Sequence, residues 1–273
     1  MISFLFLIPL LAIGTSIGIY QLNGKKEVLK LDLVQFFYAF VLAPILFVWT
    51  KSVLFFILNS EVTISLTDGE IFLFDTMYST LFIYVFAFIV MHSLTKSINL
   101  KVGRDPFHDI FKHSEYFHLW ISHVVAFLGI AVLVSILGLV NSIFPLELAL
   151  SHYFVYGFSV SGFLSGLGIF LGIWLSDPKQ ERADFMRLMK IMYGVFLILH
   201  IIFYFVFSPG FDTSHAIYWS SSSLFAAFVI CSFFAYKSET AQTVFEKISN
   251  KLKHNSWDTR VQLFNGNSKK AKR

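Results

Sequence analysis

The sequence predicts an all-α membrane protein: a polytopic bundle of about seven transmembrane helices, with the N-terminus outside the cell and the C-terminus in the cytoplasm. Two observations predict this fold class. Of the 273 residues, 56% are apolar and only 14% are charged, whereas a soluble domain has about 25% charged residues. Several apolar runs also reach the roughly 20 residues that a helix needs to cross the hydrocarbon of a bilayer.

Seven apolar segments define a membrane domain over residues 1–236. The first segment has no basic n-region and no Ala-x-Ala site after it, so it is expected to stay as an uncleaved span. The expected spans are 2–20, 34–58, 72–96, 117–142, 150–176, 188–208 and 214–236.

Basic residues predict the orientation. Segments 21–33, 96–116 and 177–190 and the C-terminal tail hold 20 of the 21 Lys and Arg residues. Seven spans place these four segments on one side, and basic loops stay in the cytoplasm. We expect the protein in the plasma membrane, with lipid and other membrane subunits as partners. Nucleic acid is not expected despite the net charge of +4, because the basic residues flank apolar segments.

Short amphipathic helices are predicted on the cytoplasmic surface. Asp105 and Pro106 have the pattern of an N-cap and a first helical position, and begin a surface helix that leads into the fourth span. Residues 237–254 form a second amphipathic helix, whose lysines are suited to anionic lipid headgroups. Residues 255–273 form a basic tail that is predicted to be disordered.

A run of evenly spaced histidines is the first candidate site. In HDIFKHSEYFHLWISH a histidine recurs every five residues, which places successive members about 140° apart on an α-helix. The i, i+4 pattern of a helical zinc site is therefore absent from this run. His108, Asp109 and His113 are candidate ligands of a divalent metal, and the alternative is an ordinary solvated helix face. The single cysteine, Cys231, excludes a thiolate cluster.

Histidines at equal depth on different spans form the second candidate site. His92 on the third span and His123 on the fourth are expected in the inner leaflet, and His152 and His215 lie near the outer surface. Pairs of histidines on separate helices are what bis-histidine ligation of haem b requires. The alternative is that these side chains make interhelical hydrogen bonds or face headgroups. His200 is the histidine predicted to lie deepest in the membrane, and no ligand role is predicted for it.

Lys51 is the one Lys or Arg outside these four basic segments, and it falls inside the second span. Its side chain can extend to the outer headgroups. The alternative is an intramembrane ion pair with Asp75, which lies at similar depth on the next span.

The fifth span is rich in glycine and serine. Small residues let membrane helices approach closely, and the serine run at 220–223 is a candidate facing surface. The glycines assigned to helix packing are Gly162, Gly166, Gly168 and Gly172.

The stretch SVSGFLSGLG, residues 159–168, resembles the nucleophile segment of rhomboid intramembrane proteases. The resemblance implies Ser161 as the nucleophile and His215 as its base. The sequence departs from that family at Ser159, where rhomboids have glycine. Ser161 is also predicted to lie deeper in the membrane than His215, whereas a nucleophile and its base must come within roughly 3 Å.

The leading functional hypothesis is a non-enzymatic transport, sensing or assembly component, because no span carries the buried carboxylates of a proton-coupled carrier. No cofactor is assigned. The alternatives are a membrane redox protein that binds haem b or a metal, and a rhomboid-like serine protease.

Overall fold

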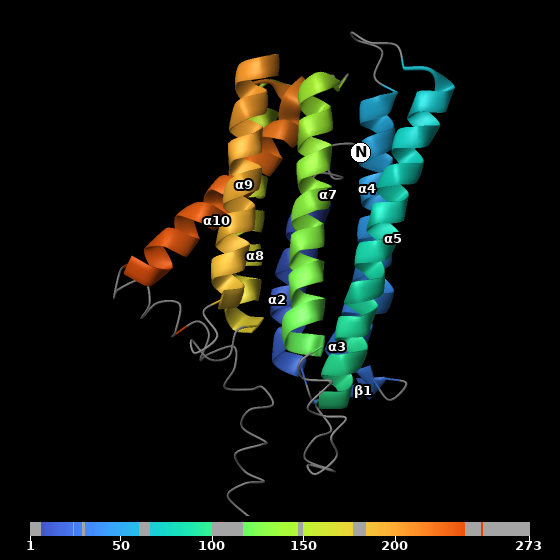
Figure 1. Cartoon of the computed structure of the whole chain (residues 1–273), viewed down its shortest axis with the longest axis vertical. Helices are drawn as coiled ribbons and strands as arrows, with labels where there is room; N and C mark the ends of the chain where they lie inside the picture. Colours follow the sequence, from blue (N-terminus) through green and yellow to red (C-terminus); the bar gives the residue numbers. More distant parts are fainter. Residues whose placement is uncertain are drawn as a thin grey trace, which may run out of the picture.

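A computed structural model describes residues 7–23, 25–28, 31–59, 66–99, 117–146, 150–176, 184–237 and 247. Within these ranges the chain is mostly helical (Figure 1). The longer helices are α2 (Ile8–Ile19), α4 (Ala43–Leu58), α5 (Asp68–Asn99), α7 (His123–Ile143), α8 (Phe154–Ser176), α9 (Asp184–Phe207) and α10 (Ala216–Lys237). The shorter elements are η1 (Tyr20–Leu22), β1 (Glu27–Val28), β2 (Leu31–Asp32), α3 (Leu33–Phe37), η2 (Tyr38–Leu42), η3 (Phe117–Ser122) and η5 (Thr213–His215).

Six helical segments are long and apolar enough to cross a membrane: Leu33–Leu58, Asp68–Ile98, His123–Ile143, Phe154–Trp174, Met186–Phe207 and Thr213–Phe234. They correspond to the second through seventh predicted spans. The first predicted span contains a shorter apolar helix, Ile8–Leu22. The predicted helical bundle is therefore confirmed, with six helices that could span a membrane, and the count of seven spans stays a prediction.

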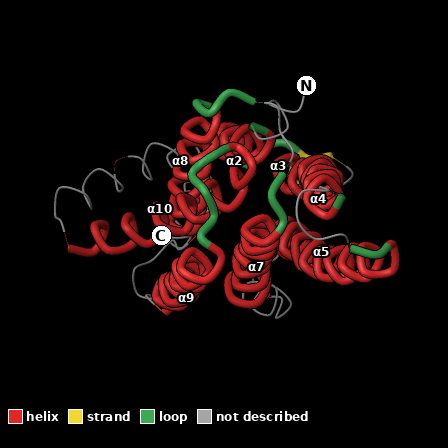
Figure 2. Tube along the Cα trace, turned by 90° about the horizontal axis from the view of Figure 1, so that it is seen from above, coloured by secondary structure: helices red, strands yellow, loops and turns green. Residues whose placement is uncertain are grey.

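Helix α7 stands between two groups of helices. Figure 2 shows it between α5 and α9. On one side, Leu133 and Leu137 of α7 pack in an apolar cluster with Leu54 of α4 and Phe82 of α5. On the other side, Ala131 belongs to a second cluster that is formed mainly by α8, α9 and α10. Because α7 contributes to both clusters, it joins the two halves of the bundle.

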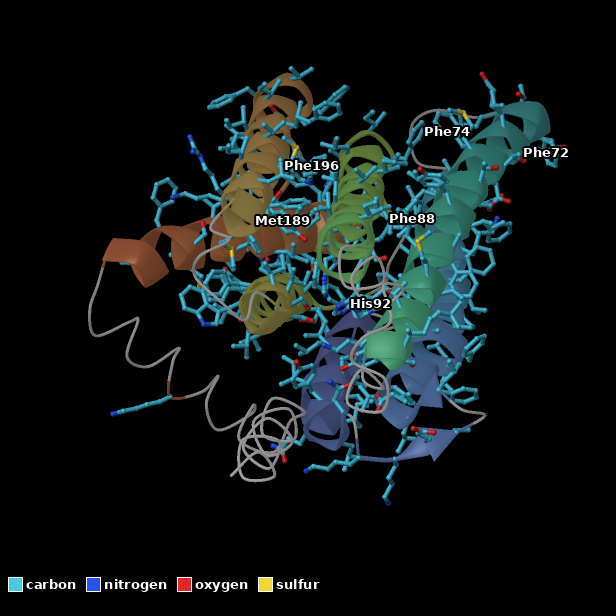
Figure 3. All side chains as sticks on the ribbon, turned by 60° about the horizontal axis from the view of Figure 1, so that its bottom comes forward. Phe72, Phe74, Phe88, His92, Met189 and Phe196 are labelled. Atoms are coloured by element: carbon cyan, nitrogen blue, oxygen red, sulfur yellow. The ribbon has the colours of Figure 1, made fainter. Side chains whose placement is uncertain are left out.

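Large apolar side chains cover the outside of the bundle. Phe205 on α9 is 76% exposed and Phe72 on α5 is 71% exposed, and Phe72 points away from the helices in Figure 3. Soluble monomers rarely expose such contiguous apolar surface. This exterior suits lipid, whereas polar groups such as Asn141 and His200 are buried between helices.

Glycines of α8 bring it against two neighbours. A β-carbon at Gly162 would overlap the carbonyl oxygen of Ser220 on α10, and one at Gly166 would overlap that of Leu224. A β-carbon at Gly168 would overlap Ile13 of α2, whereas one at Gly172 would lie 4.0 Å from Phe127 of α7, an ordinary contact. The backbones of α8 and α10 thus touch directly at Gly162 and Gly166.

Helix α5 begins at Asp68, four residues before the predicted span 72–96, because a capping box starts the helix there. Glu70 accepts hydrogen bonds from the backbone N–H and the hydroxyl of Thr67, each at 2.8 Å. The Glu70 N–H donates in return to Thr67 Oγ1 at 3.3 Å. This reciprocal pattern is the signature of a helix N-terminus.

The predicted surface helix that begins at Asp105, the one over 237–254 and the tail at 255–273 lie outside the described residues, apart from Lys237 and residue 247. Segment 21–33 contains the short antiparallel pair β1–β2, which the sequence analysis did not anticipate. Asp32 then caps α3, accepting from the N–H groups of Val34 and Gln35, while its own N–H donates to Ser97 at 3.1 Å. This contact fixes the start of α3 against the end of α5.

Candidate metal centre

Three histidines converge where α5 approaches the start of α7. His92 lies on α5, His118 in η3 and His123 at the first position of α7. One ring nitrogen from each can be chosen so that all three lie within 4.8 Å of one another. The Nε2 atoms of His92 and His123 are 3.2 Å apart, and the three ring centroids are separated by 4.6 to 4.8 Å. Figure 3 labels His92 on the inward face of α5, toward α7.

A π-helical turn places His118 beside His123. In the α-helix expected from the sequence, residues five apart point in different directions. Residues Phe117–Ser122 instead form a π-helix, whose hydrogen bonds run from i to i+5 and whose turn is correspondingly wider. Residues five apart therefore face the same side. The expectation that the five-residue spacing separates the imidazoles is wrong for this pair, because the local helix is wider than assumed.

The three imidazoles sit in a poorly hydrated environment. His118 is 3% exposed and His123 is 6% exposed. The Nε2 atom of His118 is buried and has no hydrogen-bond partner among the residues that the structure describes. A buried ring nitrogen without a partner carries a desolvation cost of about 1–3 kcal/mol. A ligand that supplies a bond to this nitrogen would remove that cost.

The donor set is that of a borderline divalent transition metal. Neutral imidazole nitrogens suit Zn²⁺, Cu²⁺ and Ni²⁺, whereas Mg²⁺ and Ca²⁺ prefer oxygen. Tetrahedral coordination with metal–nitrogen bonds of about 2.0–2.1 Å separates the ligand atoms by about 3.4 Å. The distance of 3.2 Å between His92 and His123 is close to this value. A ring nitrogen of His118 lies within 4.8 Å of both.

The predicted haem ligands His92 and His123 are thus neighbours, but their geometry suits a single ion better than a porphyrin. Axial haem ligands approach the iron from opposite faces of the macrocycle. Here the third ring, His118, lies as close to each of the two as they lie to one another. The outer histidines make separate contacts: His152 packs edge-on against Tyr156, and His215 lies against Asp212.

The predicted protease residues lie in different surroundings. Ser161 is buried on α8. His215 Nδ1 lies 2.9 Å from Ser214 Oγ and 3.3 Å from Asp212 Oδ1, at the start of α10. Burial raises the pKa of the Asp212 carboxyl, but hydrogen bonds from Ser214 and His215 outweigh this effect and hold that pKa below its ordinary value. His215 thus helps to anchor this turn.

His200 has a hydrogen-bonded role that the sequence analysis did not assign. Its Nδ1 donates to the Phe196 carbonyl oxygen at 2.9 Å, and its Nε2 lies 3.0 Å from the Ser221 hydroxyl, which donates to the Tyr218 carbonyl. Gly138 of α7 lies against both side chains, and a β-carbon there would approach His200 Nε2 to 2.7 Å. The absence of a side chain at Gly138 lets α7 close over this pair, which links α9 to α10.

Lys51 and Asp75 form an ion pair between α4 and α5. Lys51 Nζ also donates to Ser79 Oγ at 2.7 Å. The two side chains are 27% and 38% exposed. Of the two arrangements considered for Lys51, the structure shows the ion pair with Asp75. The other predicted metal ligands, His108, Asp109 and His113, lie outside the described residues.

Comparison with known proteins assigns no family. No family model matches the chain, and neither a curated protein nor a solved structure matches it. The function must therefore be argued from the residues themselves.

Proposed function

We propose that this protein is a metal-binding membrane protein in which His92, His118 and His123 together hold one divalent transition-metal ion. The single observation that carries the proposal is the convergence of three imidazoles from separate helical elements. Two histidines on one turn are common by chance. A third from a helix distant in sequence, together with a buried nitrogen that lacks a partner within the described part of the chain, favours a ligand site.

The proposal places this centre near the cytoplasmic surface. Segments 21–33, 96–116 and 177–190 carry most of the basic residues outside the tail. The helices that flank these segments have those ends at the bottom of Figure 1, where α5 and α8 end and α3, α7 and α9 begin. Basic connections stay in the cytoplasm. A seven-span arrangement with the N-terminus outside follows if Ile8–Leu22 also crosses the membrane.

A role in sensing or transport of the metal, or in assembly around it, is the leading class. An ion held between α5 and α7 would tie two helices together at the basic end of the bundle. Binding to the folded state alone would stabilise the protein by mass action. Metal availability would thereby change the stability of the α5–α7 contact, as a sensor or assembly component requires.

Metal content tests the proposal. Protein purified in detergent, equilibrated with Zn²⁺ or Cu²⁺ and freed of excess metal, is expected to retain about one ion per chain by mass spectrometry. His92→Ala, His118→Ala and His123→Ala should each lower occupancy by tenfold or more. His152→Ala, at an exposed position, is the matched control and should retain the ion. Equal occupancy in all four variants would refute the site.

Orientation is tested separately. Single cysteines placed in segments 21–33 and 177–190 of a Cys231→Ser background should resist an impermeant thiol reagent in intact cells. A cysteine at Phe211, in the opposite connection, should react. Labelling of both ends of the bundle from outside would contradict the proposed topology.

A further inference from the structure

His92, His118 and His123, the histidine triad, supply three protein ligands to the proposed metal ion. Zn²⁺ and related ions prefer four ligands, and centres with three protein ligands hold water or substrate in the fourth position. Among the residues that the structure describes, the grouping contains His92, His118 and His123 and neither a carboxylate nor a thiolate.

The charge of the site selects the kind of fourth ligand. Three neutral imidazoles leave the full double charge of the ion uncompensated. Lys96 lies one helical turn after His92 on α5. A buried charge is costly unless it is paired. A small anion in the fourth position would offset part of the charge of the ion.

We infer that the metal ion held by this triad keeps one exchangeable coordination position and binds a small anion there, with hydroxide as the anion available at neutral pH. This inference rests on the proposed function. An ion held by three histidines would lower the pKa of a bound water to about 7, so that hydroxide would be the anion available to it at neutral pH. Chloride, azide and other small monovalent anions would compete with hydroxide for the position.

Cobalt substitution tests the inference directly. Co²⁺ is expected to occupy the purified, detergent-solubilised protein and to give a visible absorption band that reports coordination. Azide should shift this band in a saturable titration, and its affinity should fall as the pH rises because hydroxide competes. A cobalt band that responds to neither azide nor pH would show four fixed ligands and overturn the inference while leaving the metal site intact.

Variants separate the two proposals. His118→Ala should abolish the cobalt band, and a wild-type protein that binds no cobalt, zinc or copper would overturn the metal site and with it this inference. Lys96→Gln should keep the band but weaken azide binding about fivefold, as expected for one nearby charge at the protein surface. Lys25→Gln, at an exposed position on the same end of the bundle, is the control and should leave azide affinity unchanged. Equal azide affinities in both lysine variants would contradict the role of Lys96.

Discussion

The Nε2 atoms of His92 and His123 lie 3.2 Å apart, although 31 positions separate the two residues in the chain. A contact of this length between two ring nitrogens requires that one donates a hydrogen and the other accepts it. At least one imidazole of the pair is therefore neutral and has a lone pair directed at its neighbour. A metal ion would use this lone pair and, once the donor's hydrogen has moved to its Nδ1, the Nε2 lone pair of the other ring as well.

The first prediction concerns pH. Metal affinity should decrease as the pH is lowered, because protons compete with the ion for the same ring nitrogens. Isothermal titration with Zn²⁺ between pH 8 and pH 5.5 should show this loss together with proton release on binding. The His152→Ala variant should follow the wild-type curve. An affinity independent of pH in this range would argue against histidine ligation.

The second prediction concerns the contact between α8 and α10. Gly162→Ala should destabilise the protein by about 2–3 kcal/mol, because the added methyl meets the backbone carbonyl of Ser220 and a backbone does not move aside easily. Gly157→Ala is the matched control on the same helix, since no atom of the described residues lies within 4 Å of its β-carbon position. That control should be neutral or slightly stabilising, because alanine favours helix over glycine.

Thermal unfolding of both variants in the same detergent measures this difference. Equal stabilities for Gly162→Ala and Gly157→Ala would contradict the direct contact between the α8 and α10 backbones.

The third prediction concerns the buried amide of Asn141 on α7. Its oxygen accepts from the N–H groups of Ile217 and Tyr218 at 3.1 Å each, and its nitrogen donates to the carbonyls of Phe144 and Ser214. Asn141 therefore caps the start of α10 from another helix. Removal of the amide leaves several buried polar groups without partners.

Asn141→Ala should thus cost at least about 2 kcal/mol in the free energy of unfolding. Asn59→Ala, which removes one exposed hydrogen bond to the Phe55 carbonyl, should cost less than about 0.5 kcal/mol. Chemical denaturation of the two variants side by side provides the measurement, and comparable losses would remove the case for an interhelical cap.

The fourth prediction concerns Lys51 and Asp75. Lys51→Met and Asp75→Asn should each destabilise the protein, because each leaves the partner's polar or charged group half-buried without its counterpart. The loss in the free energy of unfolding of the double variant should be about 1 kcal/mol smaller than the sum of the losses of the two single variants. Lys51→Met combined with Glu70→Gln is the control pair. Their effects on the free energy of unfolding should add, because Glu70 bonds to Thr67 at the start of α5. Additivity in the Lys51–Asp75 cycle would show that the pair contributes no coupling.

Part of the candidate centre was accessible from the sequence. Equal depth on adjacent spans placed His92 and His123 in the same layer of the membrane, since hydropathy fixes how far each residue lies from its span end, but it left open whether the two side chains face one another. His118 was missed because every residue was assumed to advance by 100°, as in an α-helix. The even five-residue spacing of histidines is itself compatible with a π turn, and this signal could have identified His118.

Chain composition and the periodic placement of lysine and arginine determined that this protein is a bundle of apolar helices, because burial in lipid depends on the local length and charge of each segment. Only the tertiary structure decided which polar side chains meet inside the bundle. Rotation of each helix about its axis, the width of the turn at Phe117–Ser122 and the direct approach of α8 to α10 set those contacts. Such features depend on packing between segments distant in sequence, and hydropathy contains no record of them.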